Sequence, residues 1–324
     1  MKAFLCREHG DLNQLVLEDI DTPEPGPGEV QIRVRACGIN FADSLMVGGT
    51  YQATPQLPFV PGTEIAGEIT ALGEGVSDFD VGDLVMGLPG RGGYGEYLTT
   101  NASRVVPVPE SLSVEQAASF AITYGTSHVA LAYRARLQKG ETLVVHGAAG
   151  GTGLSAVEVG VAMGATVIAT AGGPEKLKIP KAAGATHLID YRAEDIRTRV
   201  KELTGGKGAD VIFDPVGGDV FDASLRCIAF EGRILVIGFA GGETQQIKSN
   251  HVLVKNVDII GVNRPAYDQY RPDLVRQSNE TLIGWLAEGK IKPLVSKTIP
   301  LEDAVNGLRA VINRKTTGKV VITP

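Results

Sequence analysis

The sequence has few of the features that attach a chain to a membrane, to a disulfide framework or to a nucleic acid. No apolar run approaches the ~20 residues that a transmembrane helix needs. Residues 1–8 lack the apolar stretch of a signal peptide, and the three cysteines, Cys6, Cys37 and Cys227, form no C-x-x-C pair. The net charge is −6 and no basic block is present. We therefore expect a cytoplasmic protein with reduced thiols and with neither a membrane nor a nucleic-acid partner.

A glycine-rich turn between an expected strand and an expected helix is the most informative stretch that is present. Residues 141–145 predict a buried strand, His146–Gly153 form the turn, and residues 154–162 have helical spacing. In a GxGxxG template Ala148 takes the first glycine position. Such a turn lets the backbone and a helix N-terminus approach a pyrophosphate, although a chance glycine-rich turn would look similar. We expect dinucleotide binding, with phosphate contacts from Ala149, Gly150, Gly151 and Thr152.

The length of 324 residues suggests two domains, and the pattern changes twice along the chain. Residues 1–122 are short strands separated by Gly and Pro, which predicts an irregular β-barrel, and Ser113 with Gln116 has capping-box spacing. Residues 123–264 alternate strands and helices, which predicts an α/β domain with a doubly wound parallel sheet of the Rossmann type. The expected strands are Leu143–Val145, Thr166–Thr170, His187–Asp190, Asp210–Phe213, Arg233–Ile237 and Val257–Ile260.

The last sixty residues or so, 265–324, lose this alternation. A helix is expected near Asp273–Glu288, a second helix has an apolar face that includes Ala304 and Leu308, and residues 318–322 suggest a closing strand. We expect this segment to return to the N-terminal domain and a cleft between the domains to hold the cofactor.

Several motifs in order resemble one family over essentially the whole chain. They are Gly38–Asp43, Pro61–Glu64, Gly82–Val85, Val145–Gly153, Gly184–Tyr191 and Asp214–Gly218. The chain resembles the zinc-free NADPH:quinone oxidoreductase (zeta-crystallin-like) branch of the medium-chain dehydrogenase/reductase superfamily. The resemblance implies a GroES-like catalytic domain, a Rossmann domain and a homodimer.

The residue types argue against zinc. Alcohol dehydrogenases of the superfamily carry a cysteine where this chain has Asn40 and a histidine where it has Thr63. An amide and a threonine hydroxyl are not usual zinc ligands. Residues 89–94 also lack the cysteines of a structural zinc loop, and Glu64 alone makes no site. We expect no metal.

The cofactor preference follows from the end of the second expected strand. An NAD site usually has an acidic residue there, but this chain has Thr170–Gly173. The resemblance places Gly172, Lys176, Tyr191 and Arg314 around a 2′-phosphate, which favours NADPH over NADH, and Gly173 is expected to bind the cofactor as well. Taken singly, Lys176 and Arg314 could be surface charges and Tyr191 a packing aromatic.

The resemblance also names the residues of the substrate side. Asn40 and Tyr51 are the catalytic candidates, since an amide and a phenol could hydrogen-bond a carbonyl oxygen that gains negative charge. Asn40 could equally be a turn residue and Tyr51 a loop aromatic. The resemblance places Thr126, Gly238, Phe239 and Asn263 around the nicotinamide, although Thr126 could instead bond its own helix.

The leading functional hypothesis is NADPH-dependent reduction of quinones or other conjugated carbonyl compounds, because flat apolar substrates suit a cleft with few charges. One alternative is an enoyl-thioester reductase, which shares the fold and the cofactor. Another is a non-catalytic NADPH-binding protein, as lens crystallins of the family suggest; some relatives bind AU-rich RNA, which the acidic charge balance disfavours.

Overall fold

The computed structural model describes all 324 residues and divides them into two compact units. The first unit comprises Met1–Ile122 and Pro293–Pro324, and the second comprises Thr123–Lys292. The returning segment therefore starts at residue 293, not at 265. The intervening residues stay with the second unit because Ser278 Oγ lies 2.8 Å from His128 Nδ1 and Trp285 packs edge-on against the same imidazole.

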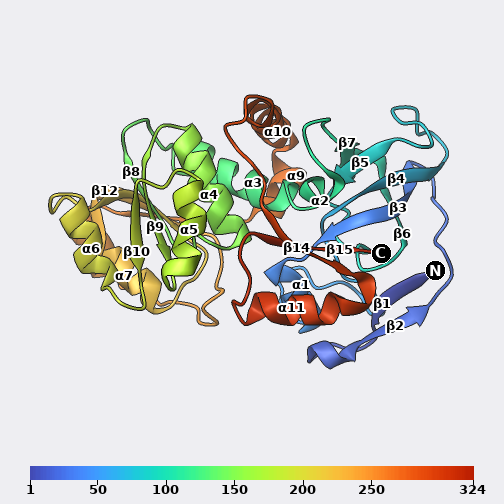
Figure 1. Cartoon of the computed structure of the whole chain (residues 1–324), viewed down its shortest axis with the longest axis horizontal. Helices are drawn as coiled ribbons and strands as arrows, with labels where there is room; N and C mark the ends of the chain where they lie inside the picture. The colour runs from blue at the N-terminus through green and yellow to red at the C-terminus, as the bar shows by residue number, and fades with distance from the viewer. The chain divides into compact units, whose positions relative to one another are not determined.

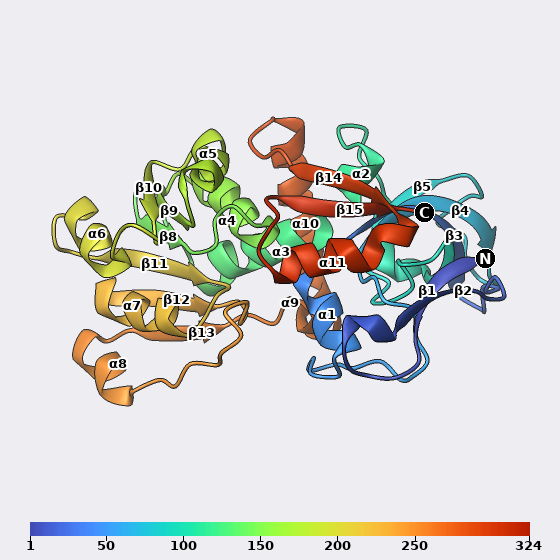
Figure 2. The same cartoon turned by 60° about the horizontal axis from the view of Figure 1, so that its bottom comes forward.

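The second unit is built on a six-stranded parallel sheet, which confirms the predicted α/β class. The strand order is β10-β9-β8-β11-β12-β13, as Figure 2 shows from one edge of the sheet to the other. The order reverses direction between β8 and β11, and ligands of such sheets bind where the order reverses. The strands are β8 (Thr142–Val145), β9 (Thr166–Ala171), β10 (His187–Asp190), β11 (Ala209–Asp214), β12 (Ile228–Val236) and β13 (Asp258–Gly261).

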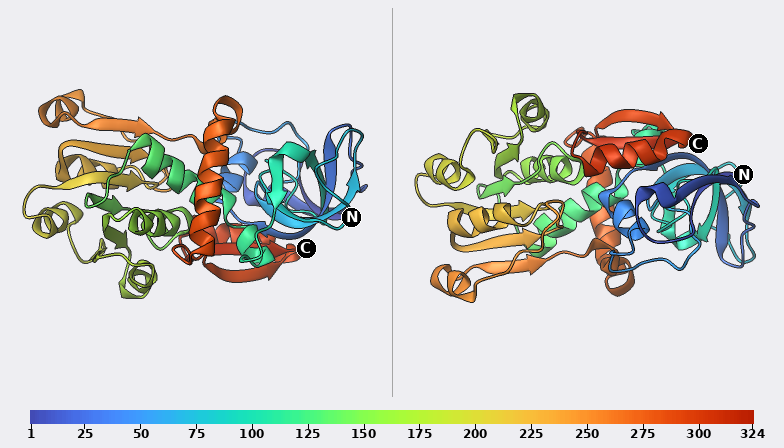
Figure 3. Two further views of the ribbon diagram at one scale, coloured as in Figure 1. Left: turned by 90° about the horizontal axis from the view of Figure 1, so that it is seen from above. Right: turned by 90° about the horizontal axis from the view of Figure 1, so that it is seen from below.

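Helices pack against this sheet because its strands are apolar on both faces. Ile212 and Phe213 point to opposite faces of β11, and both are fully buried. Helices α4 and α5 contact β8, β9 and β10, and α7 contacts β11 and β12 (Figure 1). The helices are α3 (Ala121–His128), a π-helical turn (Val129–Arg134), α4 (Gly151–Ala162), α5 (Pro174–Ala182), α6 (Ile196–Leu203), α7 (Asp219–Cys227), α8 (Ser249–Lys255), α9 (Arg264–Tyr270) and α10 (Pro272–Ala287). Helix α3 begins in the first unit. Helix α10 is uninterrupted, as Figure 3 shows.

The first unit is a mixed sheet of short strands, in keeping with the barrel-like domain expected from its Gly and Pro content. Its main path is β14-β15-β3-β4-β5-β7, with β6 paired to β3 and a separate β1-β2 hairpin. The strands are β1 (Lys2–Cys6), β2 (Leu15–Asp19), β3 (Glu29–Gly38), β4 (Ile65–Leu72), β5 (Leu84–Gly87), β6 (Tyr97–Asn101), β7 (Val105–Pro107), β14 (Val295–Pro300) and β15 (Lys319–Thr323); the helices are α1 (Phe41–Val47), α2 (Val114–Ala117), α11 (Ala304–Ile312) and three 3-10 turns (Leu12–Gln14, Ala102–Arg104, Leu301–Asp303).

The predicted closing strand is confirmed, and its register matters for the site. β15 pairs antiparallel with the end of β3, so that Val321 lies opposite Gly38 and Ile322 opposite Cys37. The Ile39 N–H also donates to the Val320 carbonyl at 2.9 Å. The side chain that begins β15 therefore lies beside the residues that follow β3.

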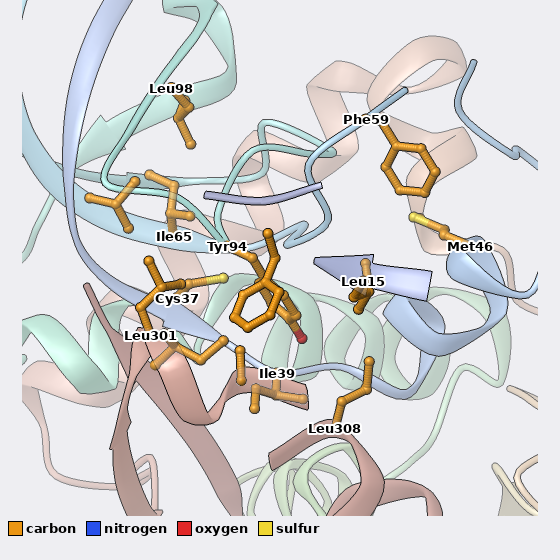
Figure 4. Packing of buried hydrophobic residues seen from close by; sticks show 14 of the residues in the cluster. Leu15, Cys37, Ile39, Met46, Phe59, Ile65, Tyr94, Leu98, Leu301 and Leu308 are labelled. Atoms are coloured by element: carbon orange, nitrogen blue, oxygen red, sulfur yellow. The ribbon is translucent and has the colours of Figure 1, made fainter. Parts of the chain in front are cut away.

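The core of the first unit surrounds one buried tyrosine (Figure 4). Tyr94 is fully buried, and Cys37, Ile39 and Ile65 belong to the same cluster. Its hydroxyl is a polar atom inside an apolar core, so it needs a hydrogen-bond partner. That partner is Asp43, whose Oδ2 accepts the hydroxyl at 3.2 Å. The core thus carries a polar centre at the start of α1.

Two smaller predictions are also confirmed. Ser113 and Gln116 form a capping box at α2, since each side chain accepts a hydrogen bond from the other's backbone N–H. The three cysteines are buried and unpaired. None of the helices combines the length and the apolar character that crossing a bilayer would need.

Candidate functional site

The glycine-rich turn joins β8 to α4 and has the geometry of a phosphate cradle. Gly147 has φ +59°, and Ala148 N–H donates to the Thr170 carbonyl at 3.0 Å, which ties the turn to β9. Gly150 is the N-cap of α4, so the N–H groups of the first helical turn have no acceptor within the helix. A Cβ at Gly153 would lie 2.2 Å from the Gly147 carbonyl oxygen. The third glycine is therefore required for packing.

A buried histidine at the start of this turn links it to β9 and α7. His146 is fully buried, and its Nε2 lies 2.9 Å from Ser224 Oγ. Ser224 Oγ donates to the Val220 carbonyl at 2.8 Å, so it accepts from His146 Nε2–H. Nδ1 then accepts from the Thr170 hydroxyl, at 3.1 Å. Burial lowers the pKa of this imidazole, which keeps it neutral. His146 is thus a structural support.

The corner after β9 contains three of the expected residues, Gly172, Gly173 and Tyr191, together with a base that the sequence analysis missed. A Cβ at Gly172 would lie 2.6 Å from the Tyr191 hydroxyl and 2.9 Å from Arg192 Nε. A Cβ at Gly173 would lie 3.8 Å from Arg192 Nη1. The guanidinium therefore lies over the two glycines. The signal available in the sequence was an arginine directly after Tyr191.

The acidic residue of this corner comes from β10 and is bound by the backbone. Asp190 Oδ1 accepts the Gly173 N–H at 2.9 Å and the Arg192 N–H at 3.0 Å. β9 itself ends at Ala171 without a carboxylate. Lys176 lies half-buried near the start of α5. Arg314 is exposed, follows α11 with φ +54° and belongs to the first unit.

The loops after β11 and β12 are hydrogen-bonded to each other at the carboxyl ends of the strands. Ala240 N–H donates to the Pro215 carbonyl at 3.0 Å, and a Cβ at Gly217 would lie 3.4 Å from the Phe239 ring. Gly238 is half-buried, and its absent Cβ would contact the same Pro215 oxygen at 3.5 Å. These contacts place Gly238 and Phe239 at the edge where the parallel strands end.

The two residues that begin α9 after β13, Asn263 and Arg264, differ in burial. Asn263 is exposed at the N-cap of α9, whereas Arg264 is buried and pairs with Asp268 at 2.8 Å. Arg264 Nε is buried without a hydrogen-bond partner, 3.2 Å from where a Cβ of Gly125 would be. Thr126, the next residue of α3, is 8% exposed. The buried guanidinium of Arg264 therefore packs against Gly125, whereas Asn263, the residue expected near the nicotinamide, is exposed.

The amide of Asn40 is the centre of a buried polar cluster in the first unit. Asn40 lies between β3 and α1 and is 8% exposed. Its Nδ2 donates to the Gly38 carbonyl at 3.1 Å and to Glu64 Oε2 at 3.3 Å, and its Oδ1 accepts from Lys319 Nζ at 2.7 Å. Both N–H bonds of the amide are therefore used within the protein. The hypothesis that Asn40 donates to a substrate carbonyl does not fit this geometry.

Lys319, which the sequence analysis did not single out, has three acceptors around its ammonium. They are Asn40 Oδ1, the Ile39 carbonyl at 3.0 Å and Glu64 Oε2 at 3.2 Å. Lys319 is 6% exposed and Glu64 is fully buried, so the two charges neutralise each other away from water. The other oxygen of Glu64 accepts the Ile122 N–H at 2.7 Å. Every donor of the ammonium is satisfied.

A second carboxyl group lies next to this pair. Asp43 accepts hydrogen bonds from the Asn40 N–H at 2.8 Å, from Thr63 Oγ1 at 3.2 Å and from the Tyr94 hydroxyl at 3.2 Å. Complete burial raises the pKa of Asp43 from 3.8 to about 6, against the lowering effect of these donors. Burial raises the pKa of Tyr51, and the charge of Asp43 raises it further. The two catalytic candidates, Asn40 and Tyr51, thus share a neighbour in Asp43.

Comparisons with known proteins agree with this geometry. Residues 26–110 match the family model described as Alcohol dehydrogenase GroES-like domain, and residues 151–280 match Zinc-binding dehydrogenase. The chain is 42% identical over 324 residues to Quinone oxidoreductase-like protein 2 homolog of Nematostella vectensis, covering 99% of this chain and 88% of the relative. The chain belongs to the quinone oxidoreductase branch of the medium-chain dehydrogenase/reductase superfamily. It is an oxidoreductase of that superfamily.

Two solved structures of the superfamily are similar over nearly the full length. Escherichia coli quinone oxidoreductase complexed with NADPH superposes with a TM-score of 0.92 at 30% identity, covering 100% of both chains. CurK enoyl reductase superposes with a TM-score of 0.89 at 30% identity, covering 99% of this chain and 98% of the other. The resemblance inferred from the motifs is therefore confirmed.

One of the two matching family models is named for zinc binding, but the side chains of this protein do not suit a zinc ion. Asn40 and Thr63 stand where zinc dehydrogenases have a cysteine and a histidine. The Glu64 carboxylate, which accepts a hydrogen bond from the Asn40 side chain, is already bound by the Lys319 ammonium. No group of three or more His, Cys, Asp and Glu side chains is arranged to hold a metal ion. An ammonium and an amide are not zinc ligands.

Proposed function

We propose that this protein is an NADPH-dependent reductase of quinones or other conjugated carbonyl compounds that works without zinc. The observation that carries the proposal is the cluster around Asn40. There the zinc ligands of related dehydrogenases are replaced by an amide and a threonine, and the remaining carboxylate is neutralised by Lys319. With no Lewis acid to polarise an unactivated alcohol or ketone, substrates that accept a hydride readily are favoured.

The cofactor is NADPH. The α4 N-terminus with Ala149, Gly150, Gly151 and Thr152 receives the pyrophosphate, because the backbone N–H groups there are free of intrahelical partners. The corner at Gly172 receives the 2′-phosphate, since it carries Arg192 and Tyr191 and the nearby Asp190 is bound by backbone N–H groups. Lys176 of α5 supplies a further positive charge for this phosphate.

The chain's own residues have two tasks in the reaction. NADPH supplies the hydride from its nicotinamide ring when bound. Tyr51 keeps its proton at neutral pH, because burial and the Asp43 charge raise its pKa, and it donates a hydrogen bond to the carbonyl oxygen that is reduced. Asn40 presents the remaining lone pair of Oδ1 as an acceptor for a hydroxyl group. Thr126 is assigned to the carboxamide side of the nicotinamide, and Arg264 packs against its neighbour Gly125.

Stopped-flow oxidation of NADPH in the presence of 1,2-naphthoquinone tests the proposal. We expect turnover that survives treatment with a zinc chelator, and a decrease of about 10-fold or more in kcat for Tyr51→Phe with an unchanged Kd for NADPH. Tyr133→Phe serves as the matched control, because Tyr133 is a partly exposed tyrosine of the π-helical turn that bonds Arg271. The absence of NADPH oxidation with every quinone and enone would refute the proposal.

A second candidate is reduction of an enoyl thioester, which the structural similarity to CurK enoyl reductase favours. The same NADPH assay with crotonyl thioester as the acceptor separates the two. A kcat/KM for the thioester that far exceeds that for quinones would assign the protein to this second activity.

A further inference from the structure

The Asn40 amide has one orientation that its surroundings accept. With Oδ1 toward Lys319 and Nδ2 toward Glu64 and the Gly38 carbonyl, every contact pairs a donor with an acceptor. Rotating the amide by half a turn would point N–H bonds at the ammonium and place an oxygen against two acceptors. Each of the three contacts would become repulsive at a site that excludes water.

Lys319 is the group that decides this orientation. Glu64 and the Gly38 carbonyl both attract N–H, but a water molecule or a hydroxyl could replace either of them as an acceptor. The ammonium is the single donor on the other side of the amide, at 2.7 Å, the shortest of the three contacts. It is charged, and its three hydrogens are all engaged, so it is fixed in place.

The position of Lys319 follows from the fold of the first unit alone. Residue 319 begins β15, which pairs with the end of β3 just before Asn40. Gly38 is required for this approach, because a Cβ there would lie 2.2 Å from the Ala118 carbonyl and 3.0 Å from Glu64 Oε2. The chain thus brings a cation to the residues that stand at the zinc positions of its metal-dependent relatives.

We propose that Lys319 is a positioning residue of the reductase. Its ammonium balances Glu64, as a metal ion would, and fixes Asn40 so that the amide oxygen is the group left to accept a hydroxyl from the bound cofactor or from the reduced substrate. This rests on the proposed function, and it assigns to Lys319 a role in turnover that a purely structural ion pair would not have.

A structural role and a positioning role of Lys319 predict different activities for a variant that lacks both charges. If Lys319 only compensates Glu64, then Lys319→Met destabilises the fold by leaving a buried carboxylate unpaired, and Lys319→Met/Glu64→Gln restores both stability and activity. If Lys319 positions Asn40, the double variant recovers stability but not activity, because the donor to Oδ1 is still missing.

The experiment measures kcat, the quinone KM, the Kd for NADPH and the melting temperature of the full-length variants with NADPH and 1,2-naphthoquinone. For the double variant we expect a melting temperature near that of the wild type together with a kcat about 100-fold lower, or an NADPH Kd that is weakened to a similar degree. A fall in kcat alone identifies a hydroxyl of the substrate, and a weaker Kd identifies one of the cofactor. Lys297→Met, at an exposed lysine of β14, is the control and should leave all values unchanged.

The decisive arm repeats the double substitution in an Asn40→Ala background. If Lys319 acts through Asn40, adding the two substitutions to Asn40→Ala changes kcat and the NADPH Kd by less than about threefold, because the amide that Lys319 orients is absent. Full additivity of the two losses, or a double variant with wild-type kcat and Kd, would overturn the proposal. A wild-type protein that reduces no quinone would instead refute the proposed function, so the two failures are distinguishable.

Discussion

The carbonyl oxygen of Gly147 lies 2.2 Å from the point that a β-carbon of Gly153 would occupy. No rotation of a side chain relieves this contact, because both partners belong to the backbone of the turn between β8 and α4. Gly153 therefore joins the strand to the helix at a distance that other residues cannot reach.

Gly153→Ala should reduce the free energy of unfolding by about 1–3 kcal/mol or more, since the helix must move to accept the methyl group. Gly150→Ala is the matched comparison. Its Cβ would meet nothing nearer than 3.5 Å, and its φ of −85° suits any residue. We expect Gly150→Ala to fold normally but to bind NADPH more weakly, because the methyl group keeps the pyrophosphate away. Urea unfolding and cofactor titration check the pair; equal stability of the two variants would contradict the prediction.

The preference for NADPH over NADH should depend on the bases near Gly172. Arg192→Ala and Lys176→Ala are each expected to weaken NADPH binding about 10-fold while leaving NADH binding unchanged, because only NADPH carries the 2′-phosphate. Lys178→Ala is the control, since Lys178 is exposed on the same helix and pairs with Glu175 at 2.7 Å. Calorimetric titration with both nucleotides measures the ratio. An equal loss for NADH would show that the two bases do not recognise that phosphate.

Asp43 should make the protein less stable as the pH rises from about 4 to 7. Its pKa is about 6 in the folded protein and 3.8 when exposed, so the folded state holds the proton more tightly. The stabilisation is complete below pH 3.8 and is lost as the pH rises through about 6, and the difference is worth about 3 kcal/mol. Urea unfolding of Asp43→Asn over this range should show a smaller decline than the wild type. Asp80→Asn, at an exposed carboxylate, should follow the wild type.

Tyr124 should stabilise the buried carboxyl group of Glu158, whose Oε2 accepts its hydroxyl at 2.5 Å. Burial raises the pKa of Glu158 above 4.5, and the Tyr124 bond opposes that rise. Tyr124→Phe should lower the free energy of unfolding by about 1–3 kcal/mol. The loss should grow as the pH rises above 4.5, because the ionised carboxylate then keeps only the Lys292 N–H of its two donors. Thermal melts at pH 4.5 and pH 8 measure it, and a loss independent of pH would exclude this explanation.

Local patterns were sufficient for much of the fold. The alternation of strands and helices in the second unit, the glycine turn and the strand that begins near Gly318 all appear in the structure where the pattern put them. Such features depend on residues that are neighbours in sequence, and apolar periodicity reports them directly. The boundary at Pro293 did not follow from pattern, because α9 and α10 are ordinary helices whose attachment depends on contacts such as that between Ser278 and His128.

Some residues of the candidate site could likewise be found from sequence motifs, and others only from the structure. Asn40 and Tyr51 stood out by motif, but Arg192, Arg264 and Lys319 became visible only through their neighbours. The sequence by itself determined the parallel sheet, the phosphate turn and the absence of cysteine and histidine at the zinc positions, since each is a matter of residue type and local spacing. The tertiary structure decided which way the Asn40 amide faces, because its partners Glu64 and Lys319 lie 24 and 279 positions away and meet it only when β4 and β15 pair with β3.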